Sequence, residues 1–216
     1  MKNIQVKRHD GNYFYKATDV FSEGMASDLA TEAYEWISNN RKPITSEVYP
    51  PETCRASYKL LKDDPFWSVF YKELKKHIVK YCEVTEIDSS LVSIDESWMT
   101  KVDDIEIPGK HSRDSLRRRL KQNNTFGNMH SHEHNQIGIV YYAKNPDPKF
   151  GTLVKLSENK IFKNDGEVNS LLIFNPQLYH TAVYPTLEDI QNNGERITIV
   201  LDCIMEESNQ ENQTED

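Results

Sequence analysis

Histidines concentrate at one point of the sequence. Three of the seven histidines lie in the segment His130-Ser131-His132-Glu133-His134. Alternate side chains of an extended strand point to the same side, so the imidazoles of His130 and His132 can reach one ion. Imidazole is a common ligand of divalent transition metals, and a rigid strand would keep other coordination positions open. The pattern indicates a metal site, although a run of surface histidines would look the same. His134 is expected at the surface or beside the ligands.

The residues downstream favour the metal site. A third histidine, His180, follows the apolar run 170–174 and the turn Asn175-Pro176-Gln177. Arg196 then opens a β-like run that continues to Leu201. The order is an H-x-H pair, a strand ending in two tyrosines, a strand after glycine, a strand followed by histidine, and a strand opened by arginine.

This order resembles the 2-oxoglutarate/iron(II)-dependent oxygenase superfamily, in particular small oxygenases of bacteria and their phages. Their H-x-H…G-V-Y-Y, L-x-x-F-x-x-x-x-x-H and E-R-I-x-I runs are similar to residues 130–142, 171–180 and 195–199. Ser97-Trp98-Met99 is similar to the tryptophan-bearing strand that precedes them. The resemblance covers roughly residues 90–204. It implies a mainly β fold, the double-stranded β-helix or jelly roll also found in cupins, with N-terminal covering helices.

The resemblance also implies a set of site residues. Carried over by position, His130, His132 and His180 are the metal ligands, and no further catalytic residue is implied. Arg196 would bind the distal carboxylate of 2-oxoglutarate, for which the planar fork of a guanidinium is suited. Thr198 would add a hydroxyl from the same face of the strand, and Tyr142 would donate to the same carboxylate. The implied reaction is hydroxylation of an unidentified substrate with Fe(II), 2-oxoglutarate and dioxygen.

The sequence departs from the common pattern of the superfamily in two places. Most members have Asp or Glu where this chain has His132, which gives a ligand set of two histidines and a carboxylate. Glu133 would point to the opposite face of a regular strand, so it does not replace that carboxylate unless the strand bulges. The second departure is a long segment, 184–194, between His180 and Arg196, which strand pairing tolerates because loop closure costs little.

Two other functions fit the same residues. A three-histidine dioxygenase of the cupin kind would keep the metal and would not need Arg196. A non-catalytic β-helix protein that binds a small molecule or a partner would need neither. Metal content separates the last possibility from both enzymes, and dependence on Arg196 separates the two enzymes from each other.

The spacing of apolar residues predicts the elements that position these side chains. Helices are expected over 28–37 and 65–82, the second beginning at Asp63-Asp64-Pro65. Short β-like runs bounded by turn residues follow, at 138–143, 151–156, 170–174 and 196–201. We expect one domain over 1–204, with a helical and irregular cover to residue 89, a β core over 90–204, and a disordered acidic tail over 205–216.

Composition bounds the function further. The 216 residues carry a net charge of -8, which argues against broad binding to nucleic-acid backbones, although residues 113–121 form a basic segment that Ser112 could cap as a helix. No apolar run is long enough for a membrane span, and the N-terminus lacks the apolar core of a secretory signal, so a cytoplasmic location is expected. The three cysteines are far apart and are expected to be buried thiols.

Overall fold

The structure, a computed structural model, describes residues 3–39, 52–55, 61–102 and 129–206. These residues form two antiparallel sheets, one of seven strands in the order β1-β2-β8-β5-β10-β4-β3 and one of three in the order β7-β6-β9. The larger sheet consists of β1 (Asn3–His9), β2 (Asn12–Thr18), β3 (Glu52–Arg55), β4 (Val92–Val102), β5 (Ile137–Lys144), β8 (Ser170–Phe174) and β10 (Arg196–Met205). The smaller sheet consists of β6 (Thr152–Ser157), β7 (Lys160–Asn164) and β9 (His180–Ala182).

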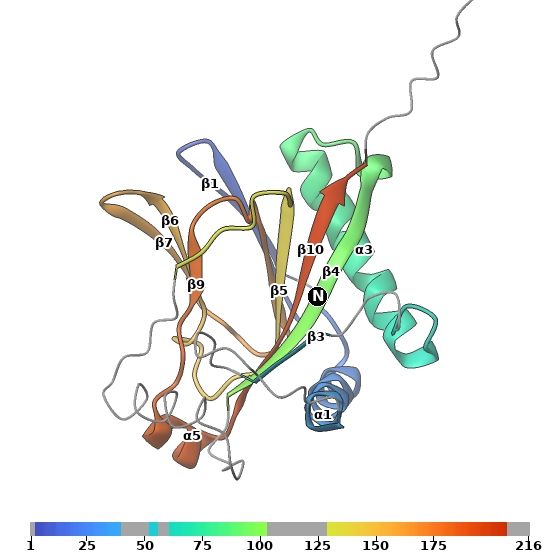
Figure 1. Ribbon diagram of the computed structural model, residues 1–216, viewed down its shortest axis with the longest axis vertical. Helices are drawn as coiled ribbons and strands as arrows, with labels where there is room; N and C mark the ends of the chain where they lie inside the picture. Colours follow the sequence, from blue (N-terminus) through green and yellow to red (C-terminus); the bar gives the residue numbers. More distant parts are fainter. Residues whose placement is uncertain (1–2, 40–51, 56–60, 103–128, 207–216) are drawn as a thin grey trace, which may run out of the picture.

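Two long helices, α1 (Glu23–Asn39) and α3 (Pro65–Thr85), cover one face of the larger sheet. In Figure 1, α3 lies to the right of β10 and β4, and the small sheet lies to their left. Helix α3 begins where Asp64 accepts hydrogen bonds from the backbone of Phe66 and Trp67, with proline at its first position. It ends at Glu86, whose backbone is left-handed with φ of 60°.

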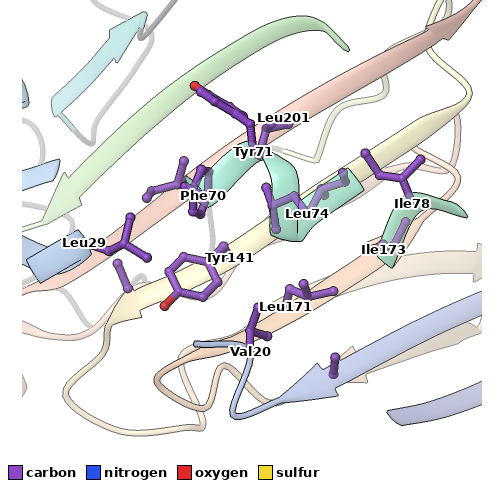
Figure 2. Close-up of a cluster of buried hydrophobic side chains, with 14 of the residues drawn as sticks. Val20, Leu29, Phe70, Tyr71, Leu74, Ile78, Tyr141, Leu171, Ile173 and Leu201 are labelled. Atoms are coloured by element: carbon purple, nitrogen blue, oxygen red, sulfur yellow. The ribbon is translucent and has the colours of Figure 1, made fainter. Parts of the chain in front are cut away.

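The main hydrophobic core lies between these helices and the larger sheet. Figure 2 shows Phe70, Leu74 and Ile78 of α3 together with Tyr141 of β5, and all four are buried. On β10 the side chains that join this core are Ile197, Ile199, Leu201 and Cys203. Because neighbouring side chains of a strand point to opposite faces, the alternate residues of β5 and β10 face the smaller sheet.

A second, smaller core fills the space between the two sheets. It contains Tyr142 and Val140 of β5, Phe174 of β8 and Val154 of β6, with Val200 of β10 packed against it. Successive side chains of β5 alternate between the two cores. Tyr141 belongs to the core under the helices, and Tyr142 belongs to the core between the sheets. The space between the sheets is therefore where the inward-facing functional side chains of β5 and β10 meet.

The structure confirms a mainly β chain with covering helices, but it corrects the expectation for the first 89 residues. These do not form only helices and irregular chain, because β1, β2 and β3 join both edges of the larger sheet. The hairpin β1–β2 was missed because the apolar alternation of β1 is limited to Ile4 and Val6, and the strand is exposed along almost its whole length. The expected helices over 28–37 and 65–82 are present and longer, as α1 and α3.

Some expectations fall outside the described residues. The helix expected after Ser112 lies in the segment 103–128, and the acidic tail lies almost entirely beyond residue 206. Among the described residues, no helix has the length and apolar character that a membrane crossing requires. Cys82 and Cys203 are buried free thiols, as the sequence predicts.

Candidate metal centre

The three predicted histidine ligands come together at one end of the space between the sheets. One ligand atom from each of His130, His132 and His180 lies within 4.8 Å of the other two. His130 and His180 are held by a pair of backbone hydrogen bonds, 3.0 Å from His130 N to His180 O and 2.8 Å in the reverse direction. The first histidine of the H-x-H pair is thus joined to the edge of β9.

His132 reaches the cluster in a different way from the one expected. It does not lie on a regular strand, because pairing stops at the single bridge formed by His130 and a turn follows at residues 133–134. Instead its backbone N–H donates to the carbonyl of Pro176 over 2.9 Å, which ties it to the turn that precedes His180. Strand alternation therefore predicted correctly that the side chains of His130 and His132 approach each other. In the structure the cause is the turn that follows His132, and not a regular strand.

Hydrogen bonds fix two of the three imidazole rings. His180 Nδ1 donates to the carbonyl of Leu178 over 2.8 Å, and His132 Nδ1 donates to the carboxylate of Asp202. When Nδ1 carries the proton, the lone pair of Nε2 is available for a metal, and such an acceptor behind each histidine is a recurrent feature of metal sites. The tautomer that these bonds select is the one a metal requires.

Burial keeps His180 uncharged. His180 is 9% exposed, and the ring of Phe174 lies 5.0 Å from it between ring centroids. Desolvation, with a smaller contribution from the neighbouring histidines, lowers the pKa of His180 to about 4, although its bond to Leu178 acts in the opposite direction. At neutral pH this imidazole is therefore unprotonated, as a metal ligand must be. By donor type and spacing, the three histidines fit a divalent transition metal.

Arg196 opens β10 and is almost fully buried, at 1% exposure. Its Nε donates to the carbonyl of Phe150 over 3.1 Å, and its Cζ lies 5.7 Å from the ring centroid of Tyr142 and 5.8 Å from that of Tyr184. Within the described part of the chain no carboxylate lies within ion-pair distance of Arg196. A buried guanidinium with only neutral neighbours is costly, so the site fits an anionic ligand.

Thr198 and Tyr142 lie beside Arg196 with partners of their own. The Thr198 hydroxyl is 3.5 Å from Arg196 Nη1 and 2.5 Å from the hydroxyl of Thr100 on β4. The Tyr142 hydroxyl is 2.6 Å from that of Thr152 and accepts from Asn164 over 3.3 Å. Either hydroxyl of the Tyr142–Thr152 pair can donate, so Tyr142 can donate to a bound carboxylate when Thr152 donates to Tyr142.

The segment 184–194, expected as a long loop, contains the short helix α5 (Leu187–Asn193). Thr186 and Asp189 form a capping box at its start, which fixes the helix locally. Lys149 pairs with Asp189 over 3.2 Å and so connects α5 to the turn that ends at Phe150. The insertion is therefore an ordered part of the Arg196 surroundings, to which it also contributes Tyr184.

Two residues of the site were not singled out from the sequence as functional. Asp202 lies on the same face of β10 as Arg196 and Thr198, and its carboxylate contacts His132. Because Asp202 is an even number of residues from Arg196, strand alternation could have indicated this position if the predicted strand had extended past Leu201. Trp98 is half-buried, and its ring centroid lies 5.6 Å from that of His132. His134 is exposed, in agreement with a surface position.

Comparison with known proteins finds similarity in structure only. No protein-family model matches the sequence, and no curated protein matches it. Among solved structures, a Pseudomonas putida prolyl-4-hydroxylase matches with a TM-score of 0.59 at 9% identity, covering 89% of this chain and 92% of that one.

Two further solved structures have a similar fold. The viral collagen prolyl hydroxylase of Paramecium bursaria Chlorella virus-1, in complex with 2-oxoglutarate, matches with a TM-score of 0.53 at 13% identity over 90% of this chain and 97% of that one. The α-ketoglutarate-dependent epimerase SnoN from nogalamycin biosynthesis matches with a TM-score of 0.58 at 9% identity over 89% and 77%. The chain therefore has the double-stranded β-helix fold of the 2-oxoglutarate/iron(II)-dependent oxygenase superfamily, which the order of its motifs resembles.

Proposed function

We propose that this protein is a dioxygenase that uses Fe(II) and 2-oxoglutarate to hydroxylate an unidentified substrate. The observation that carries the proposal is the pairing of two sites within one β-helix. One is a cluster of three imidazoles, and the other is a buried guanidinium that has no carboxylate partner among the described residues. A metal and a dicarboxylate that chelates it would complete both sites together.

In this proposal His130, His132 and His180 hold the iron. Bound iron supplies the oxidising chemistry, in which dioxygen converts 2-oxoglutarate to succinate and carbon dioxide and a C–H bond of the substrate is hydroxylated. The chain contributes binding and orientation. Leu178 and Asp202 keep the rings of His180 and His132 turned toward the metal, and Phe174 excludes water from one side of His180.

Arg196 binds the distal carboxylate of 2-oxoglutarate in this proposal. Phe150 holds the guanidinium through Nε, which leaves the two terminal nitrogens directed away from that bond for a fork-like contact with a carboxylate. The rings of Tyr142 and Tyr184 add cation–π attraction without neutralising the charge. Thr198 supplies a hydroxyl next to Nη1.

The test follows the binding of the co-substrate before any turnover. Under anaerobic conditions, Fe(II) and 2-oxoglutarate should produce the visible metal-to-ligand charge-transfer band of a chelate, and admission of oxygen should then yield succinate. His180→Ala should abolish the band through loss of metal. Arg196→Ala should weaken 2-oxoglutarate binding roughly 100-fold while iron still binds, because a buried charge pair loses one partner.

Matched variants control for the substitutions themselves. His134→Ala removes an exposed histidine from the same segment, and Arg8→Ala removes an arginine that contacts Tyr13 at the surface. Both should behave like the parent protein. Iron binding with no charge-transfer band in the parent would point instead to a cupin-type dioxygenase, and absence of metal binding would exclude both enzymes.

A further inference from the structure

Asp202 is a buried carboxylate with one polar partner. It is 3% exposed, and among the described residues its only hydrogen-bond or ion-pair partner is His132, which donates from Nδ1. It lies on the inward face of β10, next to Gly138 of β5, where a Cβ atom would lie 3.6 Å from Asp202 Oδ1. The carboxylate is therefore buried with one imidazole as its polar partner in the described part of the chain.

Asp202 places a carboxylate near a ligand set that lacks one. The common pattern of the superfamily places an acidic side chain where this chain has His132, so a cluster of three imidazoles contains no carboxylate ligand. Asp202 contacts His132 from the side of the ring opposite to Nε2. The missing charge is therefore present in the fold, but it is separated from the metal position by one imidazole ring.

We propose that Asp202 is a positioning residue that supplies the negative charge of the metal centre through His132. The inference rests on the metal site of the proposed function. Asp202 fixes the tautomer and orientation of His132, and its charge increases the electron donation of that imidazole to a metal. In return, a bound dication adds positive charge near the buried carboxylate.

Two substitutions separate charge from orientation. Asp202→Asn keeps an oxygen that can accept from His132 Nδ1 and removes only the charge, whereas Asp202→Leu removes both. The probe is Co(II), titrated by its visible absorption without 2-oxoglutarate or oxygen, so the readout does not depend on activity. Affinity should fall about tenfold for Asp202→Asn and up to about 100-fold for Asp202→Leu. Asp28→Asn, an exposed aspartate on α1, is the matched control and should leave affinity unchanged.

Thermal unfolding distinguishes this role from a purely structural one. Without metal, Asp202→Asn should melt close to the parent, because the asparagine oxygen can still accept a hydrogen bond from His132 Nδ1. With saturating Co(II), the rise in melting temperature should be smaller than in the parent. A lower melting temperature without metal, together with unchanged Co(II) affinity, would overturn the proposal.

A double-mutant cycle tests whether Asp202 acts through His132. In the His132→Ala background the imidazole is absent, so adding Asp202→Asn should change Co(II) affinity by less than it does in the parent. Equal weakening in both backgrounds would show that Asp202→Asn acts on the site without His132, and the proposal would be wrong.

The outcomes keep this inference apart from the proposed function. If the parent protein binds no Co(II), the metal site itself is wrong. If the parent binds Co(II) and Asp202→Asn binds it equally well, only the role of Asp202 is wrong.

Discussion

Burial acts differently on the two residues that define the site. Desolvation lowers the pKa of His180 to about 4, which leaves a neutral ring ready for a metal. Burial also lowers the pKa of Arg196, but a guanidinium stays charged in proteins, so Arg196 retains a charge that the described residues do not neutralise. His180 can bind a metal because its ring is uncharged, and Arg196 can bind an anion because its guanidinium stays charged.

At this scale we expect Arg196→Met to separate stability from binding. The free energy of unfolding of the ligand-free protein should be no lower than that of the parent, because an unpaired buried charge is replaced by an apolar chain of similar length. The charge-transfer band with 2-oxoglutarate should be lost. Arg196→Lys should retain part of the binding, since it keeps the charge and loses the planar fork. Urea unfolding and anaerobic titration check these results, and a band of parental affinity in Arg196→Met would contradict them.

A single strand, β10, connects the core of the protein to its site. Its outward residues, from Ile197 to Cys203, pack under the helices, and its inward residues present Arg196, Thr198 and Asp202. Strand β5 supplies the neighbouring inward positions, where Gly138 allows the turn at Pro176 to approach closely. The close approach matters because the carbonyl of Pro176 holds the backbone of His132.

Gly138→Ala should therefore disturb the metal site by displacing the turn at Pro176, without changing any metal ligand. The added Cβ would lie 2.9 Å from Cβ of Pro176, which forces the turn outward. We expect a loss of about 1–3 kcal/mol in the free energy of unfolding and weaker Co(II) binding. Gly24→Ala in α1 is the control, because its Cβ would meet nothing within 4 Å and a helix favours alanine. Parental Co(II) affinity in Gly138→Ala would mean that Pro176 does not position His132.

The larger hydrophobic core and the candidate metal site lie on opposite faces of the larger sheet. Helices α1 and α3 cover one face with the larger core, and the histidines and Arg196 lie toward the other. A change in the helix-side core should therefore alter the stability of the fold and leave metal binding by the folded protein unaltered.

Phe70→Ala tests this separation. Phe70 is fully buried and its ring lies 5.6 Å from that of Tyr141 between centroids, so its removal should cost about 3–5 kcal/mol of unfolding free energy. Val69→Ala, at a position that is 52% exposed, should change it by less than about 0.5 kcal/mol. Both variants should bind Co(II) like the parent at temperatures where they are folded. A changed affinity in Phe70→Ala would show that the two faces are coupled.

The same core predicts a loss of stability in alkali. Burial raises the pKa of Cys82 to about 11 from an ordinary value of 9.0, and it also raises the pKa of Cys203. Between these pH values the unfolded chain releases protons that the folded protein keeps, so the free energy of unfolding falls as the pH rises above 9. For Cys82 alone the fall is at most about 3 kcal/mol by pH 11. Urea unfolding should show a shallower pH dependence in Cys82→Ala, and an unchanged slope would contradict the assignment.

The sequence by itself determined the parts of this protein that depend on local pattern. Helical spacing located α1 and α3, and alternation located β5, β6, β8 and β10 within a few residues. The order of His130, His132, His180 and Arg196 indicated the site, because a metal needs particular donor atoms and those residue types are few. The roles of Thr198 and Tyr142 remain predictions.

Only the tertiary structure decided how distant segments meet. The polar strand β1 became part of the larger sheet because pairing with β2 satisfies its backbone, which apolar alternation does not reveal. Asp202 became a partner of His132 because the register of β10 against β5 and the turn at Pro176 bring together residues seventy positions apart. Local preferences act over a few neighbours, whereas hydrogen bonds between remote segments depend on the packing of the complete chain.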